Sequence, residues 1–475
     1  MSLQEQFDMS ISSLSTYLAR IRNVVSQSNP PPVSTSQKAS SQWTRLVLGN
    51  PSADLDSFVS AVIFSYFYNR KAGLRGNKEH KLYVPLLNLP NVRSSDLWRL
   101  RPEFGMALRL ATAQGESANS EGERKGREKA LLQHLITIAD TQHDGQSKLH
   151  EAFSTEDKHV APVEKQELVL VDHNAPEIAG MSHEQMQQRF NVVGCVDHHV
   201  DESYVGKSVE PRIITTGIGS CTSLVVQHLK EEGLWLSPPL HDGDSKESKQ
   251  ESSSLRQMAK LALAPILIDT SKLRATGDKC SDTDRDIVNF LESHFDKDRD
   301  DVWNRDRFFD AISESKTNSL TLLTMQEIFD RDYKVWTETT KSGQQINIGT
   351  SSLVKPLSWL VEHAQGQQNF VDEIQKFAGD KDRQLGALVL LTRAGEGKKE
   401  LAVLALTDEA RSIIPLFERN TSELQLHNWE ADHNLQKALT NAMGESSWRV
   451  WWQGDVSKSR KQVGPMIRQA VKDIR

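Results

Sequence analysis

The stretch VVGCVDHHVDE, residues 192–202, sets an apolar run directly against three polar side chains. The apolar part has the length and the β-branched content of a buried strand. It ends at Asp197, His198 and His199, which are groups that bind metal ions or phosphate. A strand that ends in this way predicts a functional site at its carboxyl end.

Three other apolar runs share this property, because an aspartate lies at or just after the end of each. The acids are Asp54 and Asp56 in LVLGNPSADLDS, Asp172 in LVLVDHN and Asp269 in ILIDTS. The carboxyl ends of parallel strands open into one crevice, so we expect these side chains to converge. A single aspartate at such a position is more often the N-cap of the next helix, and for Asp54 or Asp269 alone that reading would be preferred.

Carboxylates packed this closely repel one another and raise each other's pKa unless cations neutralise them. Carboxylate oxygens with few nitrogen ligands and no thiolate favour Mg²⁺ or Mn²⁺. Two such ions can activate a water molecule and hold the oxygens of a phosphoryl group. The set therefore predicts two divalent metal ions in a phosphohydrolase site.

The order of segments predicts an α/β fold with two domains. Apolar runs, including RLVLGN, KLYVPLLNL, RIITTG and APILIDT, alternate with helical segments and indicate a mostly parallel sheet flanked by helices. Residues 1–42 read as a helix and a Pro/Ser-rich linker, 43–300 as the catalytic domain and 301–475 as a smaller α/β domain. Two polar stretches, 111–130 and 237–254, read as exposed insertions.

Composition limits the partners. The 475 residues carry a net charge of −7, so there is no basic field for nucleic acid and we expect no nucleic-acid partner. No apolar run is long enough to cross a membrane, and we do not expect the protein to bind one. Three widely spaced cysteines give no disulfide framework and indicate a reducing, cytoplasmic location. We expect a monomer.

These motifs resemble the DHH phosphoesterase superfamily, which takes its name from the Asp-His-His sequence. GNPSADLDS, LVDHNAP, GCVDHHVDE, GIGSCTSLV and LIDTSKL follow in the order of that family. DYKVW, INIGTSSLV and SRKQVGP resemble its DHHA2 branch, which contains manganese-dependent pyrophosphatases, exopolyphosphatases and prune-type phosphodiesterases. Within that branch the chain is most similar to the fungal cytosolic exopolyphosphatases. The resemblance implies an active site in the cleft between the two domains.

Roles for single residues follow from the resemblance alone. It implies that Asp54 binds the first metal, that Asp56 binds the second and that Asp172 bridges both. His198 and Asp269 would complete the second site, while His199 would contact the substrate phosphate. Asp197 is expected to orient the imidazoles from behind.

Asn50 stands where the pyrophosphatases carry a histidine. The resemblance makes it a candidate metal ligand, and an amide oxygen in place of an imidazole shifts the expected metal from Mn²⁺ toward Mg²⁺. The same asparagine occurs in the exopolyphosphatase group, which favours that group over a pyrophosphatase.

Other residues are predicted to hold phosphate. Gly219 and Ser220 precede a helical segment, where free backbone N–H groups can face an anion, although a Gly-rich turn before a helix is common without one. The resemblance adds Lys334, Arg460 and Lys461 of the second domain as substrate contacts, although such cations are usually only solvated.

The sequence thus leads to a metal-dependent exopolyphosphatase that releases orthophosphate from the end of inorganic polyphosphate. The alternatives are a prune-like phosphodiesterase or short-chain polyphosphatase, an inorganic pyrophosphatase, and a catalytically weak interaction scaffold. The intact set of acids and histidines argues against the scaffold.

Overall fold

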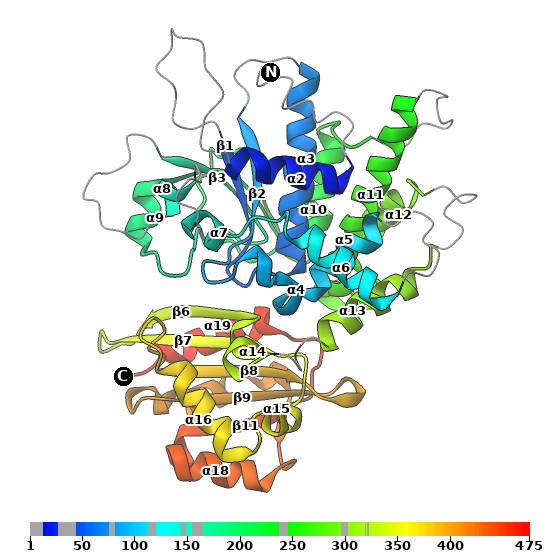
Figure 1. Cartoon of the computed structure of the whole chain (residues 1–475). Coiled ribbons are helices and arrows are strands. Elements are labelled where there is room, and N and C mark those ends of the chain that lie inside the picture. Colours follow the sequence, from blue (N-terminus) through cyan, green and yellow to red (C-terminus); the bar gives the residue numbers. More distant parts are fainter. Residues whose placement is uncertain are drawn as a thin grey trace. The chain divides into compact units, whose positions relative to one another are not determined.

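The computed structural model describes residues 13–26, 44–75, 81–112, 120–143, 149–153, 165–236, 246–295, 303–318, 320 and 323–475 (Figure 1). The chain divides into two compact units, Met1–Lys316 and Thr317–Arg475. The break falls near the end of helix α13 (Arg305–Asn318), whereas the sequence placed the domain boundary at residue 300. Each unit is described by itself below.

The first unit contains a five-stranded sheet in the order β2-β1-β3-β4-β5, and every neighbouring pair is parallel. The predicted mostly parallel α/β fold is therefore confirmed. The strands are β1 (Thr44–Leu48), β2 (Leu82–Leu86), β3 (Gln166–Val171), β4 (Phe190–Asp197) and β5 (Arg212–Ile214). Since all run the same way, the segments that follow them emerge at one edge.

Helices surround this sheet. They are α2 (Leu14–Ser26), α3 (Leu55–Arg75), α4 (Leu97–Leu100), α5 (Pro102–Thr112), α6 (Glu121–Leu132), α7 (Ile138–His143), α8 (His150–Phe153), α9 (His183–Arg189), α10 (Cys221–Glu231), α11 (Lys246–Asp269), α12 (Asp282–Glu292) and α13, with 3₁₀ turns at Ser94–Asp96 and Gly277–Lys279. Helix α3 packs against β1, β2 and β3, and it also contacts α10 and α11.

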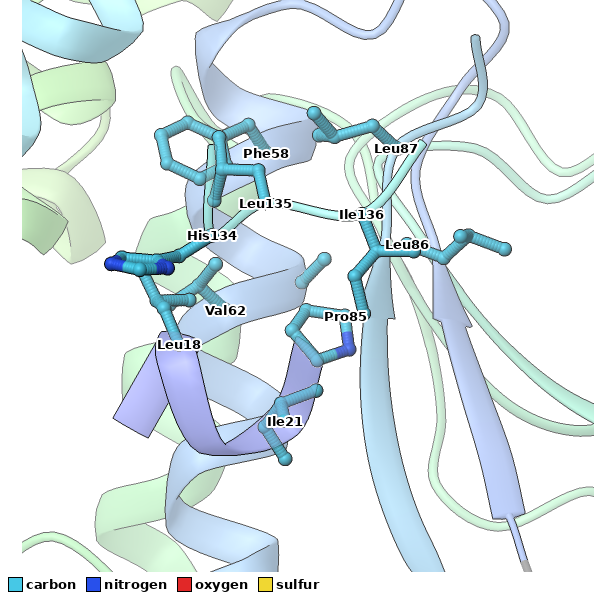
Figure 2. A pocket seen from close by; sticks show the side chains of 11 residues that line it. Leu18, Ile21, Phe58, Val62, Pro85, Leu86, Leu87, His134, Leu135 and Ile136 are labelled. Carbon is cyan, nitrogen blue, oxygen red and sulfur yellow. The ribbon is translucent and has the colours of Figure 1, made fainter. Parts of the chain in front are cut away.

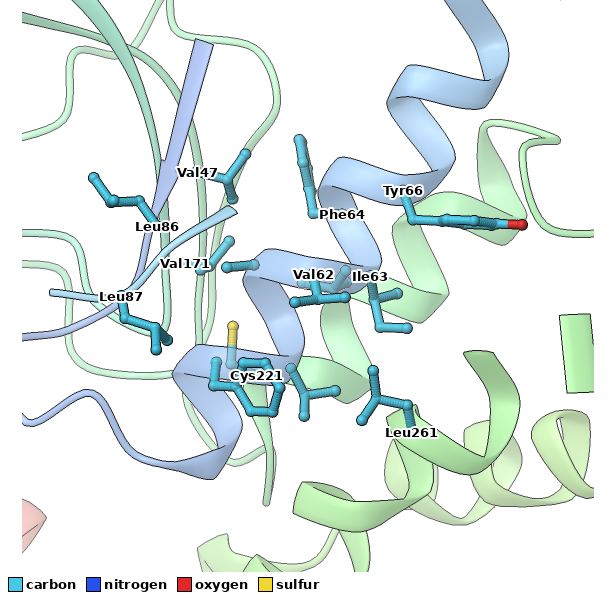
Figure 3. Packing of buried hydrophobic residues seen from close by; sticks show 14 of the residues in the cluster. Val47, Val62, Ile63, Phe64, Tyr66, Leu86, Leu87, Val171, Cys221 and Leu261 are labelled. Carbon is cyan, nitrogen blue, oxygen red and sulfur yellow. The ribbon is translucent and has the colours of Figure 1, made fainter. Parts of the chain in front are cut away.

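Helix α3 is buried on both sides because its apolar residues do not form a single stripe. Phe64 and Val62 lie toward the strand residues Val47 and Val171, while Leu261 of α11 lies on the far side (Figure 3). A small apolar cavity remains between α2, α3 and β2, lined by Leu18, Val62 and Leu87 among others (Figure 2). This layer fixes the helix whose first turn carries Asp56.

One predicted strand is wrong. The segment APILIDT forms the last turns of α11, so Asp269 ends a helix and not a strand. The apolar run continues a helix that begins at Lys246, and a short apolar run does not by itself distinguish a buried helix from a buried strand. Pro265 is accommodated inside this helix.

The N-terminal and polar segments match their predictions only in part. Helix α2 is docked, with Leu14, Leu18 and Ile21 buried in the first core, while residues 1–12 and the linker 27–43 lie outside the described residues. Helix α6 and the start of α11 occupy parts of the two stretches that were expected to be polar insertions. No helix among the described residues is long and apolar enough to span a membrane.

The second unit has its own sheet and its own core. The order is β10-β11-β9-β8-β7-β6, with one parallel pair, β7 and β8, among antiparallel pairs. The strands are β6 (Tyr333–Thr339), β7 (Gln345–Ser352), β8 (Ala387–Arg393), β9 (Lys399–Ala405), β10 (Leu426–Asn428) and β11 (Trp448–Gln453). The sequence predicted a smaller α/β domain in this part of the chain, and the sheet agrees with that fold class.

The helices of the second unit complete the α/β arrangement. They are α14 (Met325–Asp330), α15 (Leu357–His363), α16 (Gln367–Ala378), α17 (Ile413–Arg419), α18 (His433–Met443) and α19 (Arg460–Lys472), with 3₁₀ turns at Gly395–Gly397, Glu409–Ser412, Ser422–Leu424 and Glu445–Ser447. Helix α19 packs on β6 and β7. Its buried residues Val463 and Ile467 join the core of the sheet.

Candidate metal centre

Three metal-binding side chains gather where β3 and β4 end. Asp172 follows β3 directly, and His198 and His199 follow β4. One ligand atom from each lies within 4.8 Å of the others. Asp172 and His198 are buried and His199 is half-buried. The predicted convergence of β3 and β4 on one site is thus present in the structure.

Asp172 adopts a left-handed backbone conformation with φ of 61°. Aspartate tolerates this region better than most residues, and such conformations concentrate at functional sites. Its backbone N–H donates to the carbonyl of Val196, 3.0 Å away, and approaches Cys221 Sγ at 3.2 Å. The conformation is therefore held by the strand beside it and by the first residue of α10.

The ring of His198 is oriented by a backbone carbonyl. Its Nδ1 lies 3.0 Å from the oxygen of Ile218, so Nδ1 carries the proton and donates it. Its Nε2 lies 3.1 Å from Asp172 Oδ1 and 3.9 Å from Asp56 Oδ2. A neutral ring would thus point a lone pair at two carboxylates, which requires a cation between them, either a proton or a metal.

The spacing fits a divalent metal. Two neighbouring ligands of an octahedral Mg²⁺, each about 2.1 Å from the ion, lie about 3 Å apart. The 3.1 Å separation of His198 Nε2 and Asp172 Oδ1 matches this value. Carboxylate oxygens with one imidazole are also the donor set expected for Mg²⁺ or Mn²⁺. The residues present therefore fit the metal that the sequence predicts.

Asn50 positions Asp172 and does not present a ligand atom. Its side-chain Nδ2 donates to Asp172 Oδ2 at 2.7 Å, and the Ser57 hydroxyl donates to the same oxygen at 2.8 Å. The amide oxygen of Asn50 already accepts from the Ser52 hydroxyl at 2.6 Å and from the Ala53 N–H at 3.1 Å. The sequence proposed Asn50 as a candidate ligand, and in the structure its oxygen is turned into the β1–α3 loop.

Asp56 occupies the N-terminus of α10. Its Oδ1 accepts from the Ser220 hydroxyl at 2.8 Å and from the Thr222 N–H at 2.9 Å and hydroxyl at 2.7 Å, while Oδ2 accepts from the Cys221 N–H at 2.6 Å. The anion at this helix end is thus a carboxylate of the protein itself. Oδ2 also faces His198, which keeps it available to a shared cation.

This arrangement corrects the predicted phosphate loop. Gly219 donates its N–H to Asp284 Oδ2 at 2.9 Å, and Ser220 donates its hydroxyl to Asp56. A Gly-rich turn before a helix suggested free donors, but two buried carboxylates already accept from them. Gly219 and Ser220 therefore donate to acidic side chains of the first unit, whereas the sequence had assigned them to substrate phosphate.

Asp54 caps α3, as the simpler reading of a lone aspartate predicts, because its Oδ1 accepts from the Ser57 N–H at 3.0 Å. The Asp269 carboxylate interacts electrostatically with the other acids. Burial, and then the charges of Asp56 and Asp54, raise the pKa of Asp269 well above its ordinary value, while Lys316 of α13 opposes the rise. Since the Asp269 side chain is exposed to solvent, we attribute the rise mainly to the carboxylates.

Asp197 binds the ring of His199. Its Oδ1 is 2.7 Å from His199 Nδ1, and its Oδ2 accepts from Asn174 Nδ2 at 2.6 Å. Burial alone would raise the pKa of Asp197, but the charges of His199 and His198 and the hydrogen bonds from His199 and Asn174 lower it well below its ordinary value. Asp197 therefore stays ionised and orients His199, while His198 is oriented by Ile218.

Arg460, one of the predicted cations of the second unit, binds Asp332. Arg460, at the first position of α19, donates from Nη1 to the Asp332 carbonyl at 2.7 Å and from Nη2 to Asp332 Oδ1 at 2.8 Å. Lys334 follows two residues later on β6, and Lys461 follows Arg460 on α19. The fork of Arg460 is thus engaged by the protein, which the sequence did not predict.

Sequence reasoning missed Asp284, Asn174 and Lys316. Ser281 and Asp284 have the spacing of a capping box, which predicts the start of α12. That local signal cannot show that the Asp284 carboxylate reaches a loop 65 residues earlier in the chain. Asn174 follows the LVD motif by one residue, and only the fold brings it to Asp197.

Comparisons with known proteins agree with this architecture. The model of the DHH family, N-terminal domain, matches residues 45–266, and the model of the DHHA2 domain matches residues 310–470. A Schizosaccharomyces pombe protein named "Putative exopolyphosphatase" is 28% identical over 433 residues, which cover 90% of this chain and 91% of that protein. The chain therefore contains an N-terminal domain of the DHH family followed by a DHHA2 domain.

Proposed function

We propose that this chain is a metal-dependent exopolyphosphatase that removes orthophosphate from the end of inorganic polyphosphate. The observation that carries the proposal is the cluster of Asp172, His198 and His199 at the carboxyl edge of the parallel sheet. The family supports a phosphoesterase, and the name of the fission-yeast relative supports polyphosphate as the substrate.

The acids and the imidazole would hold two divalent ions, Mg²⁺ or Mn²⁺. Asp172 and His198 would share an ion with Asp56 and Asp269, and Asp54 with Asp172 would bind the other. When bound, the ions supply a Lewis acid and an activated water molecule for attack on phosphorus. Asn50 and Ser57 fix Asp172 Oδ2, so the carboxylate keeps its orientation when ligands exchange.

His199 would contact the phosphate. Its Nδ1 is bound to the ionised Asp197, which stabilises a positive ring and fixes its plane. A protonated imidazole held in this way can donate to a phosphoryl oxygen as negative charge grows on it. Lys334, Arg460 and Lys461 would hold further phosphates of the chain, because their charges suit a polyanion.

One assay tests the proposal. The full-length protein, stripped of metal and then supplied with Mg²⁺ or Mn²⁺, is given long-chain polyphosphate, tripolyphosphate, pyrophosphate or a cyclic nucleotide, and the released orthophosphate is measured. We expect the highest kcat/KM on polyphosphate. Highest turnover on pyrophosphate or on the cyclic nucleotide would assign one of the alternatives, and folded protein inactive on every substrate would support a scaffold.

A further inference from the structure

Asp284 is a fully buried carboxylate outside the predicted site. It lies in the first turn of α12 and has 0% exposed surface. Four groups donate to it: the Gly219 N–H at 2.9 Å, the Ser281 N–H at 2.7 Å, the Ser281 hydroxyl at 2.7 Å and the Ser223 hydroxyl at 2.6 Å. A neutral acceptor could satisfy these donors, so the position of a costly buried charge calls for a reason.

The donor from Gly219 belongs to the same peptide group as the carbonyl of Ile218. That carbonyl accepts from His198 Nδ1 at 3.0 Å, while the N–H at the other end of the peptide donates to Asp284 Oδ2. The order is therefore carboxylate, peptide, imidazole. Beyond the imidazole, His198 Nε2 faces Asp172 and Asp56.

Hydrogen bonds in such a chain strengthen one another. An anion that accepts from the N–H of a peptide polarises the group and makes its carbonyl a stronger acceptor. When the Ile218 carbonyl accepts more strongly from Nδ1, it fixes the tautomer of His198 and makes Nε2 a better electron donor. Direct contact of a carboxylate with a ligating histidine has this effect in metal sites, and here a peptide group lies between the two.

The peptide has little freedom to move. A Cβ atom at Gly219 would lie 2.5 Å from the Lys279 carbonyl oxygen and 2.6 Å from Thr270 Cγ2. The loop therefore packs directly on the segment that leads into α12. The contact fixes the distance between Asp284 and the peptide, and so the path to His198.

We propose that Asp284 is a positioning residue for the metal centre, acting on His198 through the Ile218–Gly219 peptide group. The inference rests on the proposed metal site. Asp284 sets the orientation and donor strength of one ligand, so its charge affects the ion that His198 binds more than the other ion.

The test measures metal binding without activity. Mn²⁺ is titrated into the metal-free full-length protein, and the two binding constants are obtained by calorimetry and from the electron paramagnetic resonance of free Mn²⁺. Asp284→Asn keeps an acceptor for Gly219 and Ser281 and removes the charge. We expect one Mn²⁺ site to weaken about tenfold and the other to change less than twofold.

Three further variants separate charge from stability. Ser182→Ala removes the side-chain cap of α9, which makes no contact with Asp284, so it should lower the melting temperature and leave both Mn²⁺ affinities within twofold. Asp284→Glu should retain most of the affinity. Glu167→Gln removes a carboxylate paired with Arg45 at the start of β3, and it should leave both sites unchanged.

Two outcomes would overturn the proposal: unchanged Mn²⁺ binding in Asp284→Asn, or equal weakening in Ser182→Ala. If Asp284→Asn does not fold, Asp284→Ser replaces it with the same expected result. A wild-type protein that binds no Mn²⁺ would remove the metal site itself, and with it the proposed function. Wild-type binding with an unaffected Asp284→Asn would reject this inference alone.

Discussion

Asp172 shows how one side chain can be fixed and reactive at once. Oδ2 is held by Asn50 and Ser57, and Oδ1 faces the imidazoles of His198 and His199. Two fixed donors on one oxygen leave the other in a defined place. The carboxylate can therefore keep its position whether a proton or a metal neutralises it.

Replacing Asp172 tests this role. Asp172→Asn removes the charge, and its amide can present N–H where a cation must bind. Loss of a group that only orients a ligand costs about 10–100-fold in affinity or activity, so loss of the ligand itself should lower kcat/KM by at least about a hundredfold. Phosphate release and Mn²⁺ titration measure the two effects.

The control is Asp201→Asn, which removes an exposed carboxylate paired with Arg212. Exposed ion pairs contribute little, so this variant should keep activity within about twofold. Full Mn²⁺ binding by Asp172→Asn would contradict the assignment of Asp172 as a ligand.

Asp269 gives the metal-free protein a distinct pH dependence. Its pKa is raised in the folded state, mainly by the charges of Asp56 and Asp54. The folded state therefore binds a proton more tightly than the unfolded chain, whose aspartates titrate near about 3.9. Between that value and the raised pKa, the free energy of unfolding falls as pH rises.

We accordingly expect the metal-free protein to melt at a higher temperature at pH 5 than at pH 7.5. Asp269→Asn should reduce this difference, and saturating Mg²⁺ should remove it by neutralising the carboxylates. Asp197 has the opposite effect on stability, because its pKa is lowered in the folded state. The stability that it contributes is lost only below about pH 4. An unchanged pH profile in Asp269→Asn would place Asp269 outside the cluster.

At the scale of elements, the sequence predicted the parallel strands well and the support of the site poorly. The strand ends were recognisable because apolar runs stop abruptly at Asp172 and Asp197. The partners of the site residues come from loops far away in sequence: the Ile218 carbonyl accepts from His198, and the Ser57 hydroxyl donates to Asp172. Asp269 was predicted to follow a strand, but it is the last residue of helix α11.

The loop before α10 provides a test at this scale. Gly219→Ala places a methyl group against the Lys279 carbonyl and Thr270, which are 2.5 and 2.6 Å away. Overpacking of this kind costs about 1–3 kcal/mol, and here it also displaces the peptide that orients His198. We expect a lower melting temperature and weaker Mn²⁺ binding.

Gly122→Ala is the matched control, because α6 leaves open space around that position. Alanine is favoured over glycine inside a helix by about 1 kcal/mol, so this change should stabilise the protein slightly or leave it unaltered. Equal melting temperatures for the two variants would show that the loop tolerates displacement.

At the scale of the whole molecule, the proposed metal site is acidic, whereas the predicted phosphate contacts of the second unit are basic. The chain has a net charge of −7, yet the proposed substrate is a polyanion. The acids of the first unit need metal ions before they can approach phosphate. The second unit instead places Lys334, Arg460 and Lys461 near the start of β6 and α19.

Truncation of each cation of this group should weaken the binding of polyphosphate. Lys334→Ala and Lys461→Ala remove charges, and loss of one charged hydrogen bond to phosphate costs about 1.5 kcal/mol, roughly tenfold in KM for polyphosphate. Arg460→Ala should also lower the melting temperature, because Arg460 binds both the carbonyl and the carboxylate of Asp332.

Lys376→Ala removes an exposed lysine of α16 and should leave KM within about twofold. Steady-state assays with polyphosphate at two salt concentrations distinguish the cases, because screening weakens the attraction of an exposed cation for a polyanion. In every variant Mn²⁺ binding to the first unit should stay unchanged, since its ligands are intact. If Lys376→Ala raises KM as much as Lys334→Ala and Lys461→Ala do, the second unit attracts the polyanion only through its general charge. Lys334 and Lys461 would then have no specific role in binding polyphosphate.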